Sequence, residues 1–342
     1  MKRSCGIGGQ AVLEGIMMKN KDKYAVAVRK PDQDIEVKVE EYKSFCEGKK
    51  IISLPFIRGI FNFIDSMVLG IKTLMYSSEF YEEEEEVQED MAADKAVRSV
   101  FKEKAEDVLM GFTVFLSVIF SVALFIVLPY FISEFLKNSL SIHSNTVLSI
   151  VEGVVRIIIF VLYIVLISMM KDIKRTYMYH GAEHKCINCI EDGRELNVEN
   201  VRSSSRLHRR CGTSFLFLVM FISIVAFILV SALLPQDAGK LMKVVVRLLL
   251  VPVIAGVSYE VLRLAGKNDS MLVRIVSAPG MALQKLTTKE PDDSMIEVAI
   301  QAVEAVFDWK TYLREIGVEV REDAAEDSEK NVEGNENAVQ NV

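Results

Sequence analysis

The chain has 342 residues, 51% of them hydrophobic, and a formal net charge of −7 at pH 7. This hydrophobic share is too high for two or three ordinary soluble domains and points to a membrane protein. The negative charge gives no support to a nucleic-acid partner, because nucleic-acid-binding proteins carry basic patches against the phosphates.

Residues 1–50 predict a small N-terminal element made of a glycine-rich turn and a β-hairpin. Polar and apolar residues alternate in "YAVAVR" and "DIEVKVEE", on either side of "KPDQD", with the two-residue period of a strand. The earlier stretch "CGIGGQAVLEG" lacks the lysine and the spacing of a phosphate-binding loop. We interpret it as a tight turn that places Gln10 and Glu14 against a loop near the membrane.

Residues 51–80 predict an amphipathic helix that begins near Ser53 and Pro55. Charged residues interrupt its apolar face, so we expect it to lie in the membrane interface or dock on a helix bundle, and not to form a further span. The segment 81–106, with an acidic run at 82–86, is expected to be a charged linker or an exposed helix face. The narrow polar stripe of the helix consists of Arg58, Asn62, Asp65 and Lys72.

Four apolar stretches are each long enough to cross a bilayer as a helix, which takes about 20 residues. They predict a mainly α-helical fold with a four-span membrane domain over residues 107–266. The loop 171–212 carries nine Lys and Arg residues. The positive-inside rule therefore places this loop and both termini on the cytoplasmic side of the inner (plasma) membrane. The apolar stretches are 108–132, 147–170, 213–234 and 244–266.

Charged residues also occur inside the predicted spans. Glu152 and Arg156 are one helical turn apart, and Arg247 lies near the start of the fourth span. We favour an ion pair near the outer interface, where the long arginine side chains extend toward water. The less favoured alternative is a path for an ion or substrate through the bundle.

The C-terminal segment 267–318 predicts a further helical part on the cytoplasmic side. Its stretch "EPDDSMIEVAIQAVEAVFDWK" combines acidic residues in the first turn with an apolar stripe, as in a soluble amphipathic helix. The acidic tail 319–342 is expected to be disordered. All five cysteines fall on the predicted cytoplasmic side, where disulfides are not expected.

The stretch "YHGAEHKC" at 179–186 carries the residues with the clearest chemistry. On a helix, His180 and His184 lie one turn apart, and Glu183 is about 100° from His184 around the axis. His-x-x-Glu-His is the inverted zinc-protease pattern, in which two imidazoles bind the metal and the carboxylate acts as general base toward water.

The same loop offers further ligands in "SRLHRRCGTSF", namely His208 and Cys211. Three of the chain's four histidines therefore lie within 29 residues, which predicts a site for a divalent metal ion, zinc by preference. Alternatively, the run is a polar helix face, or Glu183 only orients a ligand. Cys186 and Cys189 have metal-ligand spacing without a second pair, so they can equally be packing residues.

Four motifs resemble those of the YqhQ-like family of bacterial membrane proteins, which carries domain of unknown function 1385 and is described as predicted metal-dependent enzymes. The resemblance covers about residues 5–310. It implies a metal-site set and a structural or site-lining turn, and Arg209 stands where the family pattern has proline. The motifs are "GGQAVLEGIMM", "YHGAEHKC", "HRRCGTSF" and "PGMALQKLTTKEPDDSMIEVAIQA". The implied metal set is His180, Glu183, His184, His208 and Cys211, and the implied turn comprises Gly8, Gly9, Gln10, Glu14 and Gly15.

Two functional hypotheses follow. The first is a metal-dependent, hydrolytic membrane enzyme with His180, His184, His208 and Cys211 at the metal and Glu183 as base, acting on a membrane-proximal or lipid-linked substrate. The second is a non-enzymatic scaffold or assembly factor in which the metal is structural, since a fourth protein ligand would close the site. A transporter is less favoured, because no span is visibly broken in its middle.

Overall fold

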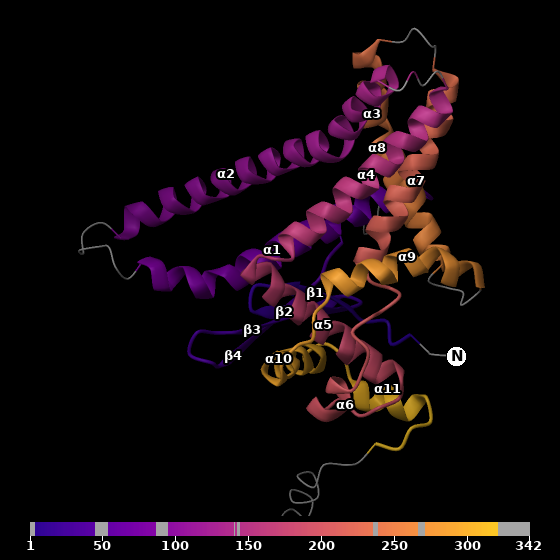
Figure 1. The fold of residues 1–342 in the computed structure, drawn as a ribbon. Coiled ribbons are helices and arrows are strands. Elements are labelled where there is room, and N and C mark those ends of the chain that lie inside the picture. The colour runs from indigo at the N-terminus through magenta and orange to yellow at the C-terminus, as the bar shows by residue number, and fades with distance from the viewer. Residues whose placement is uncertain are drawn as a thin grey trace, which may run out of the picture.

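In the computed structural model, the described residues are 4–44, 54–86, 95–139, 141, 144–234, 239–265 and 271–320. They form a mostly helical protein with one small antiparallel sheet. Figure 1 shows two regions, a bundle of long helices and a smaller head beneath it. The bundle comprises η1, α3, α4, α7 and α8, with α2 extending away from it, and the head comprises β1–β4, α5, α6, α10 and α11. The expected disordered tail at 319–342 lies outside the described residues, apart from its first two.

The sheet contains four strands in the order β1-β2-β3-β4, each antiparallel to its neighbour. The hairpin of β3 and β4 is confirmed, with Arg29 opposite Ile35. The glycine-rich stretch contains more than the predicted turn, because it forms two strands around a turn at Leu13 and Glu14 (φ 47°). The strands are β1 (Gly8–Val12), β2 (Gly15–Asn20), β3 (Lys23–Arg29) and β4 (Ile35–Glu41).

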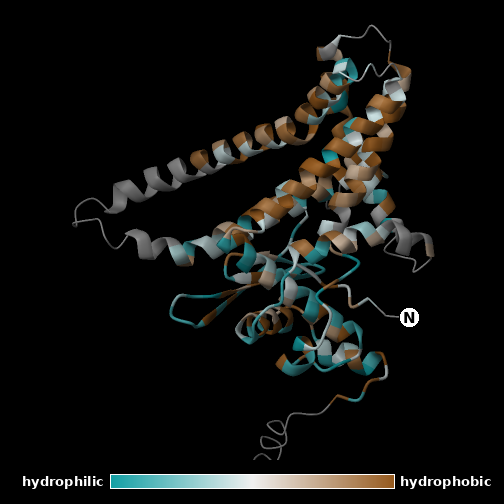
Figure 2. Cartoon of the chain, in the orientation of Figure 1, coloured by the Kyte–Doolittle hydropathy of each residue, from teal (hydrophilic) through white to brown (hydrophobic). Residues whose placement is uncertain are grey.

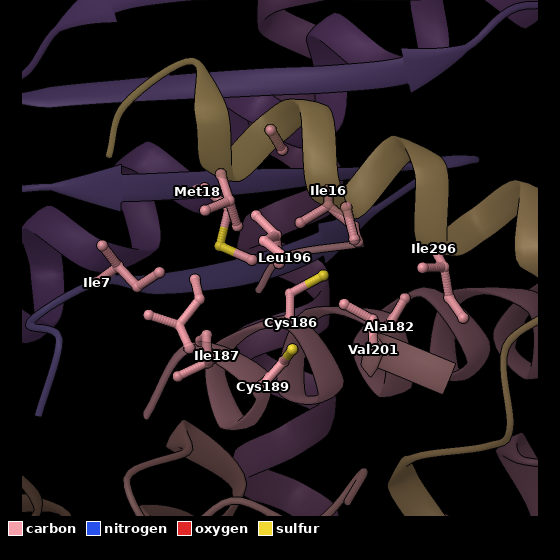
Figure 3. Close-up of a cluster of buried hydrophobic side chains, with 14 of the residues drawn as sticks. Ile7, Ile16, Met18, Ala182, Cys186, Ile187, Cys189, Leu196, Val201 and Ile296 are labelled. Atoms are coloured by element: carbon pink, nitrogen blue, oxygen red, sulfur yellow. The ribbon is translucent and has the colours of Figure 1, made fainter. Parts of the chain in front are cut away.

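Helices α5 (Lys171–Glu191) and α10 (Asp293–Glu304) pack against this sheet and enclose the main apolar core. Figure 3 shows Met18 and Ile16 of β2 facing Cys186 and Ala182 of α5. The predicted apolar stripe of α10 is confirmed, and Asp292 caps the helix by accepting from the Met295 amide. The buried members of that stripe are Met295, Val298, Ala299, Ala302 and Val303. Two short helices, α6 (Val198–Arg202) and α11 (Trp309–Glu315), complete the head.

Helix α1 (Ile57–Glu86) connects the head to the bundle and includes the acidic run 82–86 in its last turns. Its polar residues face protein. The Arg58 guanidinium makes an ion pair of 2.5 Å with Glu260 of α8, and the Asn62 amide donates to the Tyr259 hydroxyl at 2.7 Å. The helix is therefore docked on the bundle, while its apolar residues Phe63, Ile64, Met67 and Val68 remain exposed.

Among the described residues, four helices are long and apolar enough to cross a membrane. Figure 2 shows that hydrophobic residues cover the outside of the bundle along most of its length. The helices are α2 (Lys95–Val122), which continues through the π-helix η1 (Ala123–Val127) into α3 (Leu128–Ser139), then α4 (Asn145–Ile167), α7 (Gly212–Leu233) and α8 (Lys240–Ala265). Helix α9 (Met271–Thr287) packs across α7 near the head.

The predicted ion pair between Glu152 and Arg156 is present at 2.9 Å. Glu152 and Arg156 have a further partner that the prediction did not include. Both are buried between helices together with Arg247, which also bonds to Glu152. The sequence could not reveal this arrangement, since Arg247 comes from a helix 95 residues further along the chain.

Candidate functional site

Helix α5 carries two of the candidate ligands, and its position is set by close packing. A Cβ atom on Gly181 would overlap the carbonyl oxygen of Lys289. Glycine therefore allows α5 to approach the segment that follows α9, where the Lys289 amide donates to the Tyr177 carbonyl at 2.8 Å. This contact fixes one turn of α5 against the end of α9.

Three side chains converge beside that contact. One ligand atom each from His180, His184 and Cys211 lies within 4.8 Å of the other two. Cys211 is the N-cap of α7, and its Sγ accepts from the Thr213 amide at 3.4 Å. The His180 Nε2 lies 3.1 Å from this Sγ, and the two imidazole centroids are 4.4 Å apart.

Backbone carbonyls determine which imidazole nitrogens carry hydrogen. The Nδ1 of His180 lies 2.9 Å from the Thr287 carbonyl oxygen, and the Nδ1 of His184 lies 2.7 Å from that of Arg206. Because a carbonyl can only accept, both Nδ1 atoms donate. In the neutral rings, both Nε2 atoms then keep a lone pair, and that of His180 faces the Cys211 sulfur.

The Nε2 of His184 is buried and has no hydrogen-bond partner among the described residues. Burial lowers the pKa of His184, an effect that the neighbouring Cys211 thiol opposes. A buried imidazole nitrogen without a partner is costly in an ordinary core. Two oriented imidazoles beside a thiol are the borderline-soft donors that zinc prefers, so the residues present fit a Zn²⁺ ion.

Glu183 lies on the same turn of α5 but points toward the sheet. Its carboxylate accepts a hydrogen bond from the Gly9 amide, and a Cβ on Gly9 would lie 3.1 Å from the Glu183 Cδ atom. Burial raises the pKa of Glu183, while His180 and the Gly9 amide act in the opposite direction. Glycine at position 9 is thus required for the close approach of β1 to this carboxylate.

His208 does not join the group of three. Its Nε2 lies 3.5 Å from the Glu191 carboxylate, and its ring centroid is 5.6 Å from that of His184. The His208 backbone is fixed by Gln284 of α9, whose amide group accepts from its N–H and donates to its carbonyl. His208 therefore forms a wall of the site, with its ring directed toward a carboxylate.

Gln10 and Glu14 lie outside the group of three and contact neighbouring helices instead. The Gln10 amide lies against Gly70 of α1, where a Cβ would come within 2.6 Å of its Oε1. Glu14 makes a bidentate pair with Arg175 and accepts from the Tyr179 hydroxyl at 3.3 Å. Their contacts hold β1 and β2 against α1 and the first turns of α5.

The chain is similar to known proteins over most of its length. The family model described as "Protein of unknown function (DUF1385)" matches residues 54–309. The chain belongs to this family. The uncharacterised protein YqhQ of Bacillus subtilis (strain 168) is 36% identical over 296 residues, which cover 86% of this chain and 90% of that protein. No solved structure matches the chain.

Sequence reasoning missed several residues that shape the site in this member of the DUF1385 family. Glu191 is buried and binds Arg210, His208 and the Cys5 amide. Burial and the Glu191 charge raise the pKa of the Cys5 thiol to about 12. One signal was available, because Glu191 follows His184 by seven residues and so lies on the same face of α5. The sequence gave no signal for the carbonyls of Thr287 and Arg206, because only the fold brings them to the histidines.

Proposed function

We propose that the chain spans the inner (plasma) membrane four times, with the head and both termini in the cytoplasm. The apolar outside of the bundle supports insertion, because such a surface is stable only in hydrocarbon. The basic residues of the segment 171–212 support the orientation.

We further propose that the head binds a divalent metal ion, zinc by preference, through His180, His184 and Cys211. The observation that carries this proposal is the buried Nε2 of His184. It has no hydrogen-bond partner in the described part of the chain, yet it lies beside a second imidazole and a thiol. Each imidazole is oriented by a carbonyl at its Nδ1, as metal-binding histidines usually are.

The function that this geometry supports best is hydrolysis at the membrane surface. Three protein ligands leave a position open, as in catalytic zinc sites, and bound zinc polarises a substrate oxygen and lowers the pKa of water. Glu183, whose carboxylate is near enough to His180 for their charges to interact, would accept the proton of that water. Because Cys211 begins a spanning helix, the substrate would be membrane-proximal or lipid-linked.

One observation favours the scaffold alternative. The Cys211 sulfur already caps α7 by accepting from the Thr213 amide, so a metal there would join α7 to α5. In that role the metal would stabilise the fold by several kcal/mol, as structural zinc does, and Glu183 would serve only to hold β1.

Metal analysis of the purified protein tests the site. We expect about one zinc per chain, and Cys211→Ser and His184→Ala should each lower the affinity at least tenfold. Cobalt substitution gives an independent signal, because a cobalt–thiolate bond produces a charge-transfer band that Cys211→Ser should abolish. Cys189→Ser is the matched control, since Cys189 is directed at backbone carbonyls of Arg194 and Glu195. A wild type that binds neither metal would refute the proposal.

Glu183→Gln separates the enzyme from the scaffold. The amide keeps the size of the carboxylate but cannot accept a proton as a base. We expect this variant to retain its metal and to lose function in a complementation assay. Full complementation by Glu183→Gln, with metal bound, would favour the scaffold.

A further inference from the structure

A second polar centre lies inside the bundle, away from the head. Glu152 of α4 accepts from Arg156 on its own helix at 2.9 Å, and from Arg247 of α8 at 2.7 and 3.1 Å. All three side chains are buried, with at most 8% of any side chain exposed. Two arginines on one carboxylate leave one excess positive charge in the interior.

One of the arginines also binds a backbone carbonyl of a neighbouring helix. The carbonyl of Phe125 lies in η1, four residues before Pro129, which has no N–H to offer it. Arg156 satisfies this carbonyl with its Nε at 2.8 Å. Both guanidinium groups also stack on the Phe227 ring, at 4.6 and 5.6 Å from its centroid. The arginines are therefore held in fixed positions.

A partly open pocket adjoins this centre, and the empty space inside it and at its mouth is about 430 Å³. Lys243 and Arg247 of α8 line one wall of it together with Glu152, which is bonded to Arg247, and Tyr130 and Glu134 of α3 line another wall. Tyr130 is 2% exposed, and neither its hydroxyl nor the Glu134 Oε2 has a hydrogen-bond partner among the described residues. Leu148 and Leu234 add apolar surface.

The two walls differ in what they can bind. The α8 wall provides cations, which suit a phosphate. The α3 wall provides a carboxylate oxygen and a phenol without partners, which suit an ammonium group carrying N–H donors. A ligand with only an anionic group would leave the Glu134 oxygen unsatisfied. A ligand with both groups would satisfy both walls.

The depth of the cavity also limits the ligand. Its residues lie within about two and a half turns, or roughly 14 Å, of the helix ends furthest from the head. The headgroup layer of a bilayer is roughly 5–8 Å thick on each side. The mouth of the cavity therefore lies at the level of lipid headgroups in the inserted protein.

We propose that this cavity binds the zwitterionic headgroup of a phospholipid with a primary amine, with its phosphate at Lys243 and Arg247 and its ammonium at Glu134 and Tyr130. The proposal rests on the proposed membrane insertion and is independent of the metal site. In this assignment a single ligand binds both Arg247 and the oxygens of Glu134 and Tyr130 that lack hydrogen-bond partners among the described residues.

Native mass spectrometry of the full chain, released from nanodiscs of defined composition, tests the proposal. We expect retention of one phosphatidylethanolamine per chain, at least tenfold preferred over phosphatidylcholine, whose quaternary ammonium has no N–H, and over phosphatidylglycerol, which has no ammonium. Equal or better retention of either competitor would overturn the proposal. So would protection against heat by inorganic phosphate alone that equals the effect of the lipid.

Two conservative variants probe the α3 wall. Glu134→Gln should reduce the preference for phosphatidylethanolamine about tenfold, and Tyr130→Phe about threefold or more. Phenylalanine keeps the ring on which Arg247 stacks at 4.7 Å, so folding should be retained. Tyr163→Phe, on α4 and outside the cavity, is the matched control and should bind as the wild type does. Unchanged preference in both α3 variants would refute the assignment.

Discussion

The head and the bundle both bury charged residues, but they differ in where their apolar side chains lie. In the head, the fully buried residues are mostly Ile, Val, Met and Ala, as in a protein folded in water. In the bundle, Glu152, Arg156 and Arg247 are buried, while Leu, Phe and Val are exposed along the helices. The exposed apolar surface of the bundle supports the proposed insertion, because apolar surface has no reason to avoid hydrocarbon.

The polar sites of the two regions differ in the same way. The head site consists of groups that can be neutral, each imidazole being satisfied at Nδ1 by a carbonyl. The bundle site consists of three charges that depend on one another. Removing one of these three charges should therefore lower the free energy of unfolding more than removing a charge from the surface of the head.

The largest effect is expected from Glu152→Gln. Two buried arginines would lose their carboxylate, and breaking such a group costs about 3–5 kcal/mol. Thermal unfolding in nanodiscs measures the loss. The same substitution in the head, Glu297→Gln, removes a half-exposed partner of Arg29 and should cost less than about 1 kcal/mol. Equal losses at the two positions would contradict the comparison.

A smaller effect is expected from Gly181→Ala in the head. Alanine is the better helix former by about 1 kcal/mol, yet its Cβ would overlap the Lys289 carbonyl, and overpacking costs about 1–3 kcal/mol. We expect a net loss of stability and weaker zinc binding, because His180 is adjacent. Gly212→Ala, where a Cβ meets nothing within 4 Å, is the control. A stabilised Gly181→Ala variant would show that α5 can move away from α9.

The smallest effect is expected where α1 meets the sheet. Lys72, followed by Tyr24 and Lys38, lowers the pKa of Glu40 to about 2. The contact is partly exposed, so Lys72→Met should cost only about 0.5 kcal/mol at pH 7. Because the folded pKa is depressed, this stabilisation is present above about pH 4.5 and is lost as the pH falls toward 2.

Unfolding midpoints between pH 7 and pH 3 measure this effect. The difference in unfolding midpoint between wild type and Lys72→Met should become smaller toward pH 3. Glu40→Gln removes the titrating carboxyl and should show no such narrowing relative to Lys72→Met/Glu40→Gln. A gap that widens in acid would mean that another group controls the contact.

Local patterns predicted much of the fold. The length of the apolar runs predicted the four long helices, and the stripe from Met295 to Val303 predicted α10. Strands β1 and β2 were missed because glycine has no strand propensity. Gly9 and Gly15 occur there because neighbouring atoms leave no room for a side chain, which only the folded sheet reveals.

The candidate site was predictable only in part. Helical spacing brought His180 and His184 together, and their proximity to Cys211 follows from the loop that joins α5 to α7. The direction of His208 was not predictable, because Glu191 competes for its ring. The bonds from Arg247 to Glu152 join two helices far apart in sequence, and no periodicity encodes such a contact.

The position of Cys211 links the spacing of the three donors to the angle of α7. Its sulfur caps α7 and lies 3.1 Å from the His180 Nε2, so one donor belongs to the long apolar helix α7 and two to the head. At 1.5 Å per residue, α7 is about 33 Å long, and a rigid tilt of about 5° about its far end would displace the sulfur by about 3 Å. That displacement equals the present separation, so the three donors keep their spacing only at one angle of α7.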